Sequence, residues 1–382
     1  MKKIYLDYAA ATPMRPEVLA TMEPFFSEKF YNPSATYLAG RAARQDLNEQ
    51  RAKVAQVIGA RPAEIIFTAG ATEANNLAVQ GILKQYPKAE ILISAIEHTS
   101  VVAPAGLFGS KTIPVDQQGR IILNKLSDLI TDKTVLISIM LVNNEIGTIQ
   151  PLREIAALVK EKLIERKQSG NKSPLYLHTD AAQAANYLDL HVSRLGVDLM
   201  SLNGGKIYGP KQSGCLYVRA GAKLQALIMG GGQEFGLRSG TENLAAAAGF
   251  AEALEIAEAR HLEESKRLTQ LRKDFEASLL DRIPGATING SPHHRAPHIT
   301  SLTIPGSDNE RLMFELDERG IECAVGSACS ASSDEPSQVL SAIGLSEADS
   351  RSTLRFSLGF KTNKNNLEKT IQELVQLTVN NR

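Results

Sequence analysis

The sequence predicts an α/β fold with a mostly parallel sheet, followed by a smaller α+β region. Five short runs rich in Ile, Leu and Val recur along the first two-thirds of the chain, and helical patterns separate them. Such runs, apolar on both faces, are typical of strands buried in a parallel sheet. Their alternation with helices favours parallel pairing. The runs are residues 65–68, 91–94, 135–140, 175–179 and 199–202.

Two of the intervening helices carry boundary signals of their own. One pattern runs from Leu38 to Ile58 and stops at Gly59, a residue type that favours the left-handed position after a helix. Another begins at Pro151, a residue well suited to a first helical position, and keeps apolar residues on one face as far as Leu163. We therefore expect helices over both segments.

The C-terminal third has a different pattern. A long helical stretch is expected over residues 242–280, after a Gly-rich segment at 230–240. Beyond it the sequence predicts strands at 299–304, 322–325 and 353–358, and helices near 309–319 and 367–378. We therefore predict a large domain over residues 14–255 and a small C-terminal domain over residues 256–382, completed by residues 1–13.

Composition excludes several classes of protein. Among 382 residues, 42 Lys and Arg balance 42 Asp and Glu, so no net charge attracts nucleic acid or an anionic membrane. No run reaches about 18 apolar residues, and the N-terminus lacks the apolar stretch of a signal peptide. The three cysteines, Cys215, Cys323 and Cys329, are too few for a disulfide framework and fit a reducing compartment. We expect a cytoplasmic protein that binds neither membrane nor nucleic acid directly.

Lys206 and Asp180 are the first candidates for chemistry. Lys206 lies in a Gly-rich turn after a predicted strand, and a lysine removed from water becomes a nucleophilic amine suited to Schiff bases. A solvated loop lysine is the alternative. Asp180 directly follows the strand 175–179, at the edge where α/β sheets bind ligands. Its alternative role is a helix N-cap.

Two further segments also follow predicted strands. Residues 68–73 form a strand end, a turn of small residues and a helix start, which is an anion site to which Thr72 adds a hydroxyl. A bare turn is the alternative. His98 follows the strand 91–94, where it is placed to stack on a ring or to move protons. The alternative is a loop histidine with ordinary partners.

Cys329 differs from the other two cysteines. Its neighbours in the segment 326–336 are small and polar, which favours an accessible, reactive thiol. An incidental loop cysteine is the alternative. Cys215 and Cys323 lie in or beside apolar runs and are interpreted as structural.

Arg355 and Arg238 are candidate anion-binding residues. Arg355 interrupts the strand-like run 353–359, where a lone guanidinium requires a carboxylate partner, either a ligand or an internal Asp or Glu. Three histidines, His293, His294 and His298, lie near Pro292 and Pro297. We interpret this segment as a surface loop that binds no metal ion.

The order and spacing of these segments resemble the cysteine desulfurases of the NifS/IscS type. These enzymes form a branch of the class-V aminotransferase family of fold-type I enzymes, which depend on pyridoxal 5′-phosphate (PLP). The resemblance extends over nearly the full chain. It is carried by residues 5–13, 67–76, 142–147, 180–183, 206–211, 230–241, 326–337 and 355–359.

The resemblance implies roles around the PLP ring. Lys206 would bind the cofactor covalently and later shuttle protons. Asp180 would pair with the pyridine nitrogen, and His98 would stack on the ring and act in acid/base chemistry. Gln183 and Asn144 would reach the ring oxygen O3′ and the substrate side.

It also implies a phosphate site. Ala71 and Thr72 would bind the phosphate, and Thr241 would reach it from the second subunit of a homodimer. The family usually carries Ser and His where this chain has Asn203 and Gly205. Asn203 retains a side chain that can donate a hydrogen bond to the phosphate.

The implied reaction removes sulfur from L-cysteine. Arg355 and Asn144 would bind the substrate, and Cys329 would be the nucleophile that takes up the sulfur as a persulfide, releasing L-alanine. The sulfur would pass to an acceptor protein of Fe–S cluster assembly or tRNA thiolation. The alternatives are a selenocysteine lyase or aminotransferase of the same fold, or a PLP-free sulfur-transfer scaffold.

Overall fold

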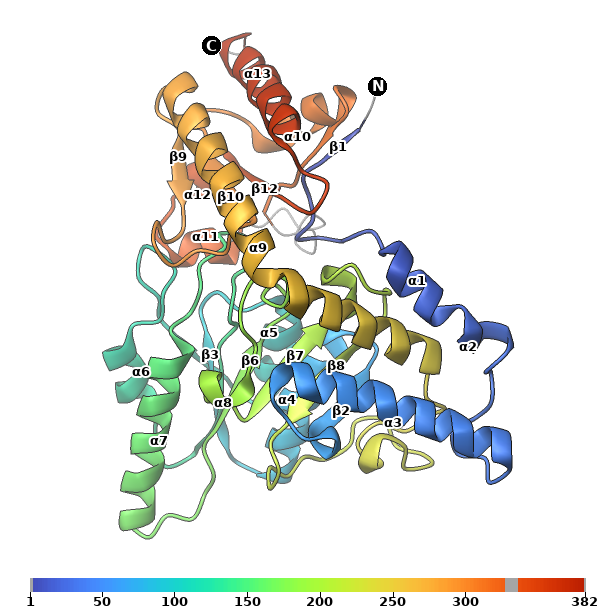
Figure 1. The fold of residues 1–382 in the computed structure, drawn as a ribbon. Coiled ribbons are helices and arrows are strands. Elements are labelled where there is room, and N and C mark those ends of the chain that lie inside the picture. The colour runs from blue at the N-terminus through green and yellow to red at the C-terminus, as the bar shows by residue number, and fades with distance from the viewer. Residues whose placement is uncertain (1–2, 327–335, 381–382) are drawn as a thin grey trace.

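The structure is a computed structural model that describes residues 3–326 and 336–380. Figure 1 shows two packed bodies joined by the long helix α9 (Leu244–Arg282), which runs out of the lower body into the upper one. The lower body holds the large sheet. The upper body gathers the C-terminal elements and the N-terminal strand.

The large sheet has mixed but mostly parallel strands. In sheet order these are β2 (Ile65–Thr68), β8 (Gly214–Val218), β7 (Leu199–Asn203), β6 (Tyr176–Asp180), β5 (Thr134–Ser138), β3 (Glu90–Ser94) and β4 (Lys111–Ile113). The strands from β7 to β4 run parallel, whereas β8 is antiparallel to both of its neighbours. The predicted α/β fold is therefore confirmed.

Helices cover both faces of this sheet, which explains the continuous apolar runs. Ile91 and Ile93 of β3 pack in one core with α4 (Ala71–Gln85) and α5 (Thr99–Gly106). Leu92 points to the opposite core, shared by α3 (Leu38–Ile58), α7 (Leu152–Gln168) and the first half of α9. The lower body also contains α1 (Pro16–Met22), α2 (Pro24–Ser27), α6 (Leu123–Leu129) and α8 (Val192–Leu195).

The upper body has its own core. Its sheet has the antiparallel order β12 (Thr353–Ser357), β10 (Ile299–Thr303) and β9 (Thr287–Asn289). The N-terminal strand β1 (Ile4–Tyr5) pairs in parallel with β11 (Ile321–Glu322). The helices here are α10 (Asn309–Glu318), α12 (Glu347–Ser350) and α13 (Lys364–Asn380), whereas α11 (Gln338–Ala342) buries Val339 and Leu340 in the core of the large sheet.

The two cores support the proposed domain division. Leu254 of α9 belongs to the core of the large sheet, whereas Leu268, further along α9, packs with Leu6 and Phe356 in the second core. We therefore propose that the large domain comprises residues 14–255, and that residues 256–382 with 1–13 form the small one. Within the described part of the chain, no helix is long and apolar enough to cross a membrane.

A buried ion pair fastens the Gly-rich segment to the large body. Arg51 of α3 donates from Nη1 and Nη2 to the two carboxylate oxygens of Glu234, at 2.6 and 2.7 Å. The backbone N–H of Phe67 donates to the same carboxylate at 2.8 Å. Glu234 and Phe235 have φ angles of 49° and 57°, in the left-handed region that non-glycine residues rarely adopt. The ion pair therefore holds a strained turn in place.

We predict that Glu234→Ala lowers the free energy of unfolding by about 3 kcal/mol or more, because Arg51 would remain buried without a counter-charge. Urea denaturation measures the change. Glu347→Ala is the matched control, since the Glu347–Arg351 pair is exposed and its loss should cost less than about 1 kcal/mol. Equal losses in the two variants would contradict the assigned role of the Arg51–Glu234 pair.

Candidate active site

A cavity of about 210 Å³ opens at the carboxyl ends of the parallel strands, where α/β sheets bind ligands. It brings together most of the site residues predicted from the sequence: Ala71, Thr72, His98, Asn144, Asp180, Gln183, Asn203, Lys206 and Arg355. Sequence reasoning missed other lining residues, namely Ala9, Ala10, Ser100, Met140, Val142 and Ala182.

Lys206 faces this cavity and not bulk water. It ends the short 3₁₀ turn η2 (Gly204–Lys206) after β7, and its side chain is half-buried. Its Nζ donates to the backbone carbonyls of Ala9 and Ala10 at 2.9 and 2.5 Å. The N-terminal segment thereby holds the amine at the wall of the cavity.

Asp180 is the last residue of β6 and is 6% exposed. Its Oδ2 accepts a hydrogen bond from Asn75 Nδ2 at 2.6 Å, and its Oδ1 accepts one from the N–H of Ala182 at 2.9 Å. These donors fix the orientation of the carboxylate, which lines the cavity. Asn75 also donates to Ser100 Oγ at 2.8 Å, which extends the network towards His98.

His98 caps the N-terminus of α5. Its Nδ1 accepts from the backbone N–H of Ser100 at 3.1 Å, so the neutral ring carries its proton on Nε2. Burial lowers the pKa of His98; Lys206 contributes in the same direction, and Asp180 opposes the shift. The neutral imidazole is therefore favoured, with a face suited to stacking on an aromatic ligand.

The N-terminus of α4 offers free hydrogen-bond donors. The backbone N–H groups of Ala71 and Thr72 and the hydroxyl of Thr72 donate to no other residue in the described chain. Asn203 uses Oδ1 to accept from the N–H of Gly205 at 3.1 Å, and within the same described ranges its Nδ2 has no partner. Gly70 has φ 99° and leaves this corner open, with Asn203 as the nearest neighbour of a Cβ placed there. This donor set fits a phosphate.

Arg355 of β12 also lines the cavity and is 2% exposed. Its Nη2 donates to Asp7 Oδ1 at 2.6 Å and its Nη1 to the carbonyl of Asn144 at 3.1 Å. The carboxylate partner required by the sequence is thus internal in this structure. Arg238 likewise has an internal partner, Glu73, at 3.0 Å.

Two buried acids beside the cavity were not predicted. Glu97 accepts from the N–H of Met140 at 2.6 Å, and Glu145 accepts from Ser337 Oγ at 2.5 Å. Burial raises the pKa of Glu97 well above its ordinary range, with Asp180 adding to the shift, and burial likewise raises the pKa of Glu145. Both shifts favour the neutral acid, which limits negative charge at the site.

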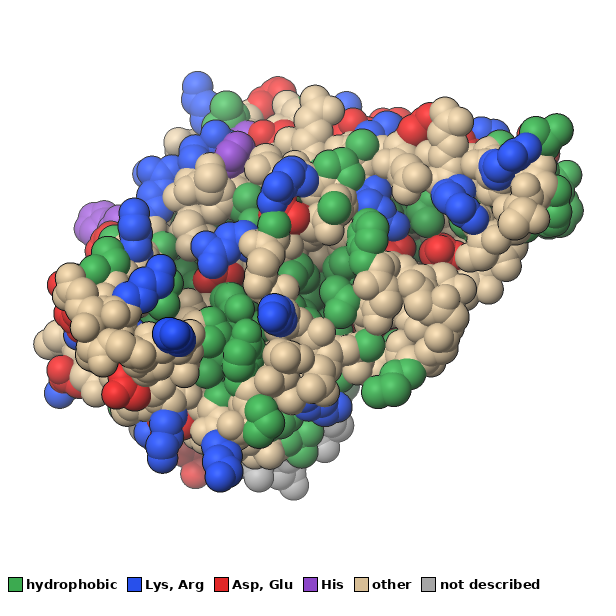
Figure 2. All heavy atoms as spheres, turned by 90° about the horizontal axis from the view of Figure 1, so that it is seen from below, with side chains coloured by type: hydrophobic (Ala, Val, Ile, Leu, Met, Phe, Trp, Pro, Cys, Tyr) green, Lys and Arg blue, Asp and Glu red, His purple; other side chains and the backbone are tan. Residues whose placement is uncertain are grey.

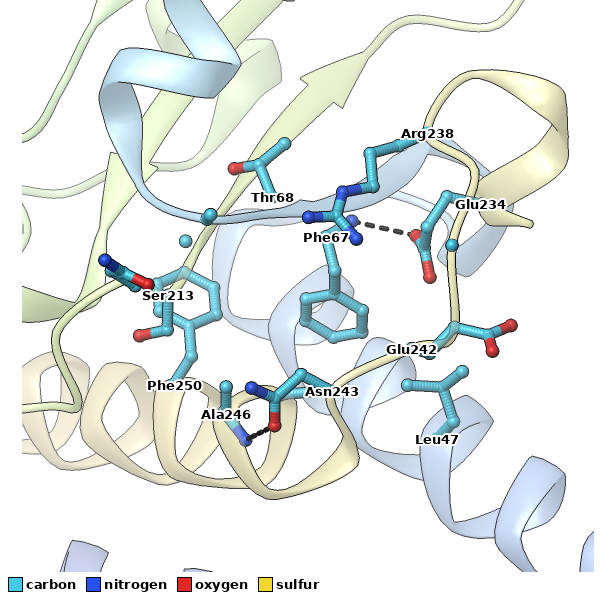
Figure 3. A pocket seen from close by; sticks show the side chains of 15 residues that line it. Leu47, Phe67, Thr68, Ser213, Glu234, Arg238, Glu242, Asn243, Ala246 and Phe250 are labelled. Carbon is cyan, nitrogen blue, oxygen red and sulfur yellow. Dashed lines mark hydrogen bonds between the residues drawn. The ribbon is translucent and has the colours of Figure 1, made fainter. Parts of the chain in front are cut away.

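Among the described residues, one predicted site residue, Thr241, does not line this cavity. Thr241 is exposed and lies between Gly240 and Glu242, which line a second cavity of about 160 Å³. Figure 3 shows that cavity beneath β2, where Arg238 and Glu234 project from the Gly-rich segment. Cys329 lies outside the described residues.

One sequence interpretation was wrong. His293 and His294 are exposed as expected, but His298 is 1% exposed. Its ring stacks on Tyr187 at a centroid distance of 4.1 Å, and its Nε2 lies 3.2 Å from Gln183 Oε1. Contact between the two bodies buries His298, and the local sequence contains no sign of that contact.

Comparison with known proteins defines the class. The aminotransferase class-V family model matches residues 4–370, so the chain belongs to that family. A structure titled "NIFS-LIKE PROTEIN" is similar with a TM-score of 0.90 and 30% identity, covering 99% of this chain and 100% of that one. The mixed sheet and second domain are therefore those of the fold-type I architecture.

Curated relatives narrow the family further. "Cysteine desulfurase IscS" of Dictyoglomus turgidum is 40% identical over 98% of this chain and 94% of its own length. A structure titled "SspA in complex with cysteine" is 36% identical with a TM-score of 0.80, covering 94% of this chain and 99% of that one. The chain belongs to the cysteine desulfurase branch of the class-V aminotransferases.

We predict that His98 in the cofactor-free protein titrates below its ordinary pKa of 6.5, because burial penalises the imidazolium. The folded state then holds the neutral ring, so lowering the pH through 6.5 reduces the free energy of unfolding. NMR of labelled histidines measures the midpoint, with His98→Gln assigning the resonance. His178, whose pKa burial lowers to about 3, is the control that stays neutral between pH 5 and 8. A His98 midpoint above 6.5 would contradict the prediction.

Proposed function

We propose that this protein is a PLP-dependent L-cysteine desulfurase. The observation that carries the proposal is the common cavity of Lys206, Asp180, Arg355 and the free donors at the start of α4. A reactive amine, a ring-nitrogen partner, a carboxylate binder and a phosphate site are what an amino-acid enzyme using PLP requires. The relatives named cysteine desulfurase and the similar structure in complex with cysteine support this choice.

The residues around the cavity suit the proposed cofactor. Lys206 would bind it covalently, Asp180 would hold the proton of the ring nitrogen, and His98 would cover one face of the ring. Ala71 and Thr72 would donate to the phosphate through their backbone N–H groups. The bound group would supply an electron sink that stabilises negative charge at the substrate Cα.

Asn203 would add a further donor to the phosphate. Its Oδ1 is engaged by the N–H of Gly205, which turns the amide so that Nδ2 keeps its hydrogen-bonding capacity. This geometry supports a phosphate contact at the position where the family usually has Ser. Gly205 itself contributes no side chain.

The substrate would lie in the cavity that Arg355 and Lys206 both line. Arg355 would bind the carboxylate and Asn144 would contact the substrate beside it, fixing the direction of the Cα–H bond. The amine of Lys206 would then take the Cα proton and return it to form L-alanine. The carbonyls of Ala9 and Ala10 keep this amine at the cavity wall.

Cys329 would accept the sulfur. Its thiolate would form an S–S bond with the substrate sulfur as the C–S bond breaks, so that one thiol and one L-cysteine give one persulfide and one L-alanine. The persulfide would serve an Fe–S scaffold or a tRNA-thiolation protein. A reducing, cytoplasmic location would preserve such a thiol.

We further propose a homodimer in which Thr241 reaches the phosphate of the other subunit. Thr241 is exposed and does not line the cavity of its own chain. Large hydrophobic side chains are exposed on the same large body, including Phe30 at 64%, Leu38 at 78% and Met229 at 85%. Figure 2 shows hydrophobic side chains in a recess on one face, with Lys and Arg around it.

We predict that Cys329→Ala lowers sulfide release from L-cysteine to background while the absorbance of bound PLP remains. Cys323→Ala is the matched control. Burial raises the pKa of the Cys323 thiol to about 12, so at neutral pH it is a poor nucleophile, and its loss should leave sulfide release largely intact. Sulfide and alanine released by the purified holoenzyme are measured for both variants and the wild type. Full sulfide release by Cys329→Ala would refute the persulfide mechanism.

A further inference from the structure

Arg355 is only partly committed to its internal partners. Asp7 engages Nη2 and the carbonyl of Asn144 engages Nη1. The buried Nε has no hydrogen-bond partner in the described residues, although a guanidinium has five N–H donors. Arg355 lines the cavity, and its guanidinium has N–H donors beyond the two engaged by Asp7 and Asn144. Arg355 therefore keeps donors for a carboxylate while Asp7 already balances its charge.

Asp7 is held in place independently of this ion pair. Its backbone carbonyl accepts from Tyr5 Oη at 2.8 Å and from the N–H of Ala10 at 3.0 Å. Its backbone also forms a bridge with Ser357, beside Arg355 on β12. The side chain of Asp7 is 18% exposed, so solvent screens the charge of its carboxylate only in part. A neutral replacement should thus change the charge at Arg355 more than the backbone around it.

We propose that Asp7 is a positioning residue that sets the affinity of Arg355 for the carboxylate of an α-amino acid. The inference rests on the proposed function and assigns a residue that governs its substrate affinity. Asp7 holds the guanidinium in orientation and competes electrostatically with the carboxylate of the incoming amino acid. The site therefore binds that carboxylate weakly enough to release the product, L-alanine, which carries the same group.

The variant Asp7→Asn separates charge from geometry. Asn keeps an oxygen that can accept from Arg355 Nη2, but it no longer repels the substrate carboxylate. The carboxylate of Asp7 and that of the substrate would both lie beside the buried guanidinium of Arg355, and two like charges this close repel each other appreciably. We expect Asp7→Asn to bind L-alanine roughly fivefold to tenfold more tightly and to lower KM for L-cysteine more than it changes kcat.

L-Alanine and ethylamine form the matched probe pair, because they differ only in the carboxylate. Absorbance titration of the PLP-bound enzyme gives the affinity for each. The ratio of the two affinities should rise in Asp7→Asn and in Asp7→Ser, a second neutral variant that covers the case in which the first fails to fold. Asp7→Glu keeps the charge and should hold the ratio near that of the wild type.

A ratio that is the same in the wild type and the neutral variants would overturn the proposal, since a purely structural Asp7 affects both probes alike. Failure of the proposed function has a different signature, because a wild-type enzyme that releases no sulfide from L-cysteine can still be titrated with both probes.

Discussion

The contact of Lys206 with the backbone of Ala9 and Ala10 is the interaction on which the site depends. Lys206 follows strand β7 of the large sheet. The carbonyls that accept from its amine belong to Ala9 and Ala10, which follow strand β1, and β1 pairs with β11 of the small body. Thr12 completes the connection, since its hydroxyl donates to the carbonyl of Gly205 at 3.0 Å and accepts from the N–H of Tyr208 at 2.8 Å. The N-terminal segment thus joins the two bodies at the position where the chemistry is proposed.

Charge balance is the second constraint. Asp180 needs its charge if it is to hold a ring proton, and Arg355 needs its charge to attract a carboxylate. Burial raises the pKa values of Glu97 and Glu145, so these acids add little negative charge beside them. Asp7 is the exception, because it pairs directly with Arg355 at 2.6 Å. The positive and negative charges around the cavity are therefore closely balanced, and a substrate carboxylate changes that balance.

Local patterns predicted the scaffold well. The helix Leu38–Ile58 ends as expected because Gly59 adopts φ 67°, and the long helix follows the Gly-rich segment with its ends shifted by two residues. Strand β8 is absent from the sequence prediction, and the structure pairs it in antiparallel fashion with both β2 and β7. Asp180 and Lys206 were predicted as site residues because each lies at or just after the end of a strand, which the local sequence pattern shows.

Residues placed by distant contacts could not be predicted. The pairing of Asp7 with Arg355 joins the two ends of the chain, and the ring of His298 is buried by Tyr187 from another element. Asn75 lies within a motif that was noticed, but its bonds to Asp180 and Ser100 appear only in three dimensions. A polar residue at a buried position near the start of a helix needs hydrogen-bond partners, and this is the signal that would have identified Asn75.

The most direct test of the central claim is the site of covalent PLP attachment. The purified protein, loaded with PLP and reduced with borohydride, is digested and its peptides are weighed by mass spectrometry. The account predicts the added pyridoxyl phosphate mass on the peptide containing Lys206, and its loss in Lys206→Ala. A protein that takes up no PLP, or carries it on a different lysine, would contradict the account.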